Sequence, residues 1–174
     1  MDKEFKTVEI KSNLELPSEL IRISEGSGQF GLFFKSFDEN QSEYSISAGG
    51  VTGKFEVEYN CLGMDCRFEC DITMGNLYSF YLQLENVYEC FPGVNPIATL
   101  ENYGSLDRSN LTFKFDKMGH VQVNGRFMNK DAHYSSGILF DVTMDAFYNI
   151  TYIINTLKNF FEELKRIQGH SNFY

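Results

Sequence analysis

The feature that most constrains the fold is a pattern that occurs twice in the sequence. Asp71-Ile-Thr-Met74 opens one run of spaced apolar residues, and Asp141-Val-Thr-Met144 opens another 70 positions later. With that shift the apolar positions coincide, so that Leu77, Phe80, Leu84, Val87 and Phe91 align with Phe147, Ile150, Ile154, Leu157 and Phe161. Spacings of three and four residues are typical of a helix that buries one face. The chain is therefore predicted to contain two similar amphipathic helices.

Smaller matches extend the likeness beyond the helices. Thr73 and Thr143 stand at corresponding positions, and each hydroxyl is a candidate helix N-cap. Upstream, Gly53-Lys-Phe55 matches Gly125-Arg-Phe127, here with a shift of 72 residues. Chance similarity between two amphipathic helices is the alternative, but the shared Asp-x-Thr-Met start favours an internal duplication.

Segments of alternating polarity precede both helices. Such alternation, with one apolar face, is typical of antiparallel strands that pack on one side. In the first half it predicts strands at 20–23, 29–37, 44–48, 54–59 and 65–72, the last three forming a meander. In the second half it predicts strands at 97–100, 111–115, 121–127 and 138–142.

These elements predict an α+β fold built from two antiparallel β-meander-plus-helix units. A chain of 174 residues, of which 43% are hydrophobic, can form one domain over residues 1–174, with halves at about 20–93 and 94–167. One unit alone could not cover its apolar sheet face, whereas two units together could. We therefore expect two long helices packed on one face of an antiparallel sheet or open barrel.

The charge distribution bears on partners and location. The formal net charge is −9, and residues 101–174 are balanced, so the whole excess lies in the first hundred residues. Such a surface disfavours nucleic acid and anionic membranes and could attract a basic partner, although solubility alone also explains it. The chain has no apolar run of transmembrane length, and Met1-Asp-Lys-Glu-Phe-Lys lacks the apolar core of a signal peptide. A cytoplasmic location is expected.

The side chains that could carry chemistry form no recognisable catalytic motif. Cys66 and Cys70 alternate with Phe68 and Ile72, which favours core packing over a zinc site. No cofactor and no metal are expected, and the protein is not expected to be an enzyme.

The histidines and the acidic residues leave alternatives open. His120, in a predicted turn, and His133, in a predicted loop, could act as an acid or base, but surface histidine is the simpler interpretation. Among the acids, Glu56, Glu58, Glu69 and Asp71 should share the exposed face of neighbouring strands. A pair of carboxylates can hydrolyse glycosides, but a solvated sheet face explains these four residues with fewer assumptions.

One segment resembles a known family. The strand–turn–strand from Leu111 to Gly125 contains Gly119-His120-Val121, with Val123 and Gly125, and is similar to the core motif of the WapI-type immunity proteins, which are encoded beside bacterial toxins. Further similarity covers the helix running into Gly93, the segment Ala98-Thr-Leu100, and the helix start with Asp145 and Tyr148, so the resemblance spans about residues 74–164. The chain departs from the family at Ala146 and Asn149, and the motif assigns no functional residue.

The resemblance implies an immunity protein that neutralises a cognate toxin by occlusion. Together with the acidic first hundred residues, it leads us to expect a non-catalytic binding protein. The expected partner-binding residues are Glu56, Glu58, Glu69 and Asp71, facing a toxin with a basic surface. Two alternatives remain: a homo-oligomeric structural protein, dimerising through a second helix broadened by Tyr152, Ile153 and Phe160, or a small-ligand-binding domain.

Overall fold

The structure is a computed structural model that describes residues 17–25, 28–37, 50–91, 97–103, 108–118, 120–128, 137–144 and 146–168. The first half contains four strands and a helix, namely β1 (Ser18–Glu25), β2 (Gly28–Phe37), β3 (Thr52–Cys61), β4 (Met64–Thr73) and α2 (Met74–Glu89). The second half repeats this order with β5 (Ile97–Tyr103), β6 (Arg108–Phe115), β7 (Val121–Met128), β8 (Gly137–Met144) and α3 (Ala146–Gln168).

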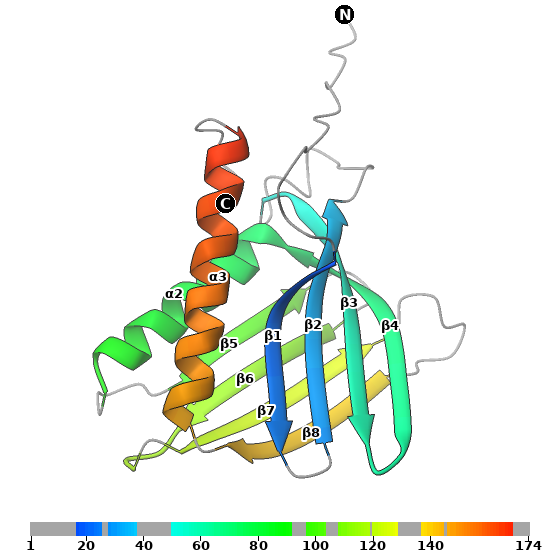
Figure 1. Cartoon of the computed structure of the whole chain (residues 1–174), viewed down its shortest axis with the longest axis vertical. Coiled ribbons are helices and arrows are strands. Elements are labelled where there is room, and N and C mark those ends of the chain that lie inside the picture. The colour runs from blue at the N-terminus through cyan, green and yellow to red at the C-terminus, as the bar shows by residue number, and fades with distance from the viewer. Residues whose placement is uncertain are drawn as a thin grey trace, which may run out of the picture.

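The α+β class and its two meander-plus-helix units are confirmed. The strands form two antiparallel four-stranded sheets, in the orders β1-β2-β3-β4 and β5-β6-β7-β8, rather than one shared sheet. The strands of one sheet run across those of the other, and the two helices lie together beside them (Figure 1). Hereafter sheet 1 denotes β1–β4 and sheet 2 denotes β5–β8.

The two units are joined reciprocally. Helix α2 follows sheet 1 in sequence but packs against β5, the first strand of sheet 2, while α3 follows sheet 2 and packs against β1. The last strand of each sheet also contacts the first strand of the other. Each unit therefore covers a sheet edge of its neighbour, which explains why neither unit would be expected to fold alone.

A single hydrophobic core joins the sheets and helices. The rings of Phe30 on β2 and Phe127 on β7 lie 5.2 Å apart, so the inner faces of the two sheets touch directly. On the helix side, Phe80 of α2 lies 5.5 Å from Phe113 of β6. All the aligned stripe residues with described side chains are buried except Phe91, which follows α2 and is partly buried. The helical stripe predicted from the spacing is thus the core-facing surface of both helices.

The two helices begin differently. Thr73 caps α2 as predicted, because its side-chain oxygen accepts a hydrogen bond from the backbone N–H of Asn76 at 3.3 Å. The corresponding prediction for Thr143 was wrong: β8 continues through Met144 and α3 starts at Ala146, so Thr143 lies inside a strand. The second unit therefore extends its last strand further before the helix starts.

Two details of the predicted strand arrangement also need correction. The strand predicted at 44–48 lies outside the described residues, and the strands that pair with β3 in the structure are β2 and β4. The match between Gly53-Lys-Phe55 and Gly125-Arg-Phe127 does not correspond to equivalent positions in the two sheets. Gly53 pairs with Ile72, whereas Gly125 pairs with Phe140, two residues before the Val142 that the helix-start alignment equates with Ile72.

The broad apolar stripe of the second helix, α3, packs mainly against the core of the same chain. Ile153 and Phe160 are buried in the core, and of the three residues expected to widen the stripe only Tyr152 is exposed, at 50%. None of the helices in the described part of the chain has the length and apolar character needed to cross a membrane.

Candidate functional site: the charged outer face of sheet 1

Alternation along β3 and β4 places charged side chains on the outer face of sheet 1. Phe55 and Val57 are buried, while Glu56 and Glu58, which alternate with them, point outward. In the register of the two strands Lys54 lies opposite Asp71, Glu56 opposite Glu69, Glu58 opposite Arg67 and Asn60 opposite Asp65. Directly opposed like charges such as Glu56 and Glu69 destabilise a sheet unless a cation lies between them.

A β-bulge in β2 supplies that cation. The register of β2 against β3 shifts between Phe34 and Ser36. Lys35 is therefore the extra residue, and no residue of β3 lies opposite it in the strand pairing. Its ammonium group lies 3.6 Å from Glu56 and donates a hydrogen bond to Glu69. The hydrogen bond to Glu69 is the main reason why the pKa of Lys35 is raised.

A second bulge, in β1, adds an arginine to the same face. The register shifts between Glu19 and Ile21, so Leu20 and Ile21 are both buried, and Glu19 and Arg22 come to the same side of the strand. The Arg22 guanidinium donates to Glu19 at 2.9 and 2.6 Å. Neither bulge was predicted; the adjacent apolar pair Leu20-Ile21 and the adjacent polar pair Lys35-Ser36 were the breaks in alternation that could have indicated them.

Arg22 lies flat over the neighbouring strand. Its guanidinium carbon is 5.0 Å from the centre of the Phe33 ring, a cation–π contact that also explains why Phe33 is half-buried on an outer face. Gly31 makes room for this arrangement, since a Cβ there would lie 2.9 Å from Nη1 of Arg22 and 2.7 Å from the Phe33 ring. The arginine is therefore held by Glu19, by Phe33 and by the absence of a side chain at residue 31.

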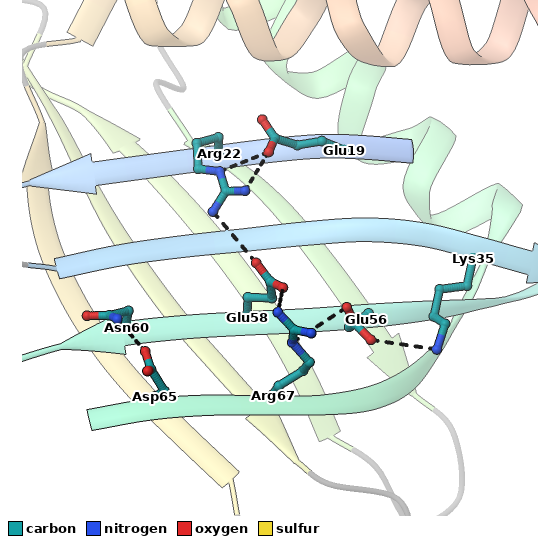
Figure 2. A network of polar contacts seen from close by, with 8 residues as sticks. All are labelled: Glu19, Arg22, Lys35, Glu56, Glu58, Asn60, Asp65 and Arg67. Atoms are coloured by element: carbon teal, nitrogen blue, oxygen red, sulfur yellow. Dashed lines mark hydrogen bonds and ion pairs between the residues drawn. The ribbon is translucent and has the colours of Figure 1, made fainter. Parts of the chain in front are cut away.

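Arg67 links the two halves of this arrangement. It contacts Glu58 through Nη2, and its Nε lies 3.8 Å from Glu56 (Figure 2). Glu58 in turn lies 4.0 Å from Nη1 of Arg22. We call the set Glu19, Arg22, Lys35, Glu56, Glu58, Arg67 and Glu69 the outer-face network.

A polar hollow lies beside the network, toward the β3–β4 turn. It has a volume of about 330 Å³, and its lining residues are Arg22, Gln29, Glu58, Tyr59, Asn60, Asp65, Cys66 and Arg67. Asn60 donates a hydrogen bond from its side chain to Asp65 at this end (Figure 2). The hollow therefore offers fixed donors and acceptors side by side, which suits recognition of charged groups.

The four residues predicted to bind a partner all belong to this face, and Glu56, Glu58 and Glu69 among them are already in ion pairs. Glu56, Glu58 and Glu69 are members of the network, while Asp71 lies opposite Lys54 nearer the start of α2. Among the described outward side chains of sheet 1, six acids, Glu19, Glu56, Glu58, Asp65, Glu69 and Asp71, accompany four bases, Arg22, Lys35, Lys54 and Arg67. The face is thus a mixed-charge surface with a small acidic excess.

The other candidate residues lie elsewhere. His120 is at the β6–β7 turn, where Nδ1 lies 2.8 Å from Oδ2 of Asp116, and His133 lies outside the described residues. Cys70 is buried and Cys66 packs partly against the core, as predicted. Within the part of the chain that the structure describes, no group of three or more His, Cys, Asp or Glu residues is arranged to hold a metal ion.

Comparisons with known proteins add no functional assignment. No protein-family profile and no curated protein matches the sequence. Among solved structures, the chain is similar to "Structure of the plant transcriptional regulator PBF-2", with a TM-score of 0.40 and 9% sequence identity, over 87% of this chain and 88% of that one. A likeness at that level carries no argument about function. The resemblance to immunity proteins is not tested by these comparisons and stays a prediction.

Proposed function

We propose that this chain is a non-catalytic binding protein of the immunity-protein type, which acts in the cytoplasm by covering a basic surface of a cognate toxin. The observation that carries the proposal is the outer-face network, which fixes several carboxylates in place on an exposed sheet. Because these side chains are already ordered by bulges and ion pairs, they lose little conformational entropy when a partner docks.

Charge supports the choice of a basic partner. The first hundred residues carry the whole formal excess of −9, and the described outward side chains of sheet 1 include two more acids than bases. Complementary charge accelerates association and favours the correct partner, and both effects weaken with added salt. Binding through this face should therefore be fast and salt-sensitive.

The test uses the toxin domain encoded by the reading frame next to this gene. The wild-type chain should bind the purified domain in biolayer interferometry and restore growth to bacteria that express it. Reversing Glu56, Glu58, Glu69 and Asp71 to Lys should lower affinity at least about tenfold, since interfacial charge pairs contribute on the order of 1.5 kcal/mol or more.

A matched control reverses four acids away from sheet 1, namely Glu85, Glu89, Glu101 and Glu162, which changes the net charge by the same amount. Circular dichroism should show that both variants are folded. Equal loss of binding in both variants would mean that only total charge matters. An adjacent frame that encodes no toxin, or a toxin that the wild-type chain does not bind, would contradict the proposal.

A further inference from the structure

The carboxylates at the centre of the outer-face network are enclosed, while the arginine between them is not. The side chains of Glu56 and Glu58 are 18% and 28% exposed, whereas that of Arg67 is 68% exposed. Figure 2 shows Arg67 reaching from β4 across to both carboxylates on β3. Of the three groups, Arg67 is the one that can move away without disturbing the sheet.

The two carboxylates keep other partners when Arg67 leaves. Lys35 lies 3.6 Å from Glu56, and Arg22, held over Phe33, lies 4.0 Å from Glu58. Both cations are positioned by bulges in their own strands and do not depend on Arg67. The pair of carboxylates is therefore a preformed acceptor site.

Glu56 also has unused capacity to accept hydrogen bonds. Its two cationic neighbours lie 3.6 and 3.8 Å away, longer than an ordinary N–H···O hydrogen bond. A donor from outside could approach this carboxylate more closely than Arg67 does. Residues two apart on a strand are separated by about 6.6 Å, a span that the planar fork of a guanidinium bridges better than the compact ammonium of a lysine.

We propose that Arg67 occupies, within the free protein, a binding site for an arginine side chain between Glu56 and Glu58, and that an arginine of the protein partner displaces it on docking. This inference rests on the proposed function and names the group that the same face recognises. Displacement costs little, because an exposed ion pair contributes only about 0.2–1 kcal/mol. The incoming guanidinium then contacts the same two carboxylates with less solvent around it.

The test titrates the full chain with a short peptide, acetyl-Gly-Arg-Gly-amide, followed by proton–nitrogen NMR. Removing the resident guanidinium with Arg67→Gln should lower the peptide's Kd about threefold relative to wild type, corresponding to loss of a competing surface ion pair. The largest shifts should fall on the amides of β3 around Glu56 and Glu58. Adding Glu58→Gln to Arg67→Gln should remove the gain, and the peptide with Gln in place of Arg should not bind.

The matched control is Arg126→Gln, which removes the same charge from an exposed position on the outer face of sheet 2. It should leave the Kd at the wild-type value. The proposal is overturned if Arg67→Gln and Arg126→Gln give the same Kd, if the shifts fall outside β3 and β4, or if no variant binds the peptide. The toxin is absent from this titration. A negative titration therefore leaves the toxin-binding proposal intact, and failure to bind a toxin leaves the titration result intact.

Discussion

The two sheets have similar inner faces and different outer faces. Inside, alternating positions of both sheets are apolar and buried, and Phe30 and Phe127 meet across the core. Outside, sheet 1 carries the outer-face network, whereas the central row of sheet 2 is neutral across its first three strands, with Thr99 opposite Thr112 and Thr112 opposite Asn124. The inner faces are constrained by the common need to bury a core, and the outer faces are free of that constraint. The outer faces are therefore where the two halves can differ in function.

The largest expected effect tests the equivalence of the inner faces. Phe55 in sheet 1 and Phe113 in sheet 2 are both fully buried. Replacing either with Ala should lower the free energy of unfolding by about 3–5 kcal/mol through lost burial and a cavity. Urea denaturation followed by circular dichroism measures both. Phe→Leu variants provide smaller losses if the Ala variants do not fold, and Tyr152→Ala, at a half-exposed position, is the control. A large loss of stability for only one of the two Phe→Ala variants would show that the inner faces of the two sheets are not equivalent.

The next effect concerns the β3–β4 hairpin turn of sheet 1. The β3–β4 turn consists of Leu62 and Gly63, with φ angles of 51° and 83°, and Leu62 is 84% exposed. A leucine in this left-handed region is strained, whereas Asn tolerates it and suits a two-residue hairpin turn. Leu62→Asn should therefore raise stability by about 1 kcal/mol in thermal or urea unfolding. Met64→Asn, at an exposed strand position next to the turn, should give no such gain; equal gains would mean that removing an apolar surface group is the cause.

A smaller effect tests the difference between the outer faces. The coupling between Lys35 and Glu69, obtained from a double-mutant cycle with Lys35→Met and Glu69→Gln, should be about 0.2–1 kcal/mol at low salt. It should fall toward zero in 1 M NaCl, where charges are screened over about 3 Å. The neutral pair Thr99 and Thr112 should show a coupling that does not depend on salt. A salt-independent Lys35–Glu69 coupling would remove the electrostatic distinction between the faces.

The smallest effect is local and concerns pH at the β6–β7 turn. Asp116 accepts hydrogen bonds from the backbone N–H groups of Met118 and His120, at 2.8 and 2.9 Å. The hydrogen bond with the His120 side chain is the main cause of the lowered pKa of Asp116. A lowered folded-state pKa means that the turn is stabilised above the unfolded value of about 3.9 and loses this stabilisation as the pH falls through the folded pKa.

An NMR titration of the Met118 and His120 amides should show a midpoint below about 3.9. The Asp116→Asn variant should lack this transition, while the Leu62–Gly63 turn of sheet 1 should show none of comparable size in either protein. A midpoint at or above the unfolded value would contradict the role assigned to the carboxylate.

Much of the fold could be predicted from periodicity. The spacing of Leu77, Phe80 and Leu84 identified the core face of α2, and alternation identified most of the described strands, because both patterns depend only on local backbone geometry. The start of α3 was misplaced, since the Asp-x-Thr-Met likeness does not reveal that β8 runs on through Met144. Sequence similarity at a helix start does not fix how far the preceding strand stays paired.

The candidate site was predictable in part. Alternation placed Glu56, Glu58 and Glu69 on one exposed face, and their shared face is what the structure shows. Their cationic partners were not predicted, because Lys35 reaches Glu69 from 34 residues away and only by way of a bulge. Bulges depend on how two strands fit together, so a single strand's sequence indicates them only weakly.

The elements, their apolar faces and the two-unit order could be inferred from the sequence, because each follows from the period of its own side chains. Tertiary packing set three other features: the strands divide into two sheets, each helix covers the other unit's first strand, and the acids of sheet 1 are matched by Arg22, Lys35 and Arg67. These features join residues far apart in the chain. They are set by which surfaces bury each other best when the two units meet, and no local pattern encodes that choice.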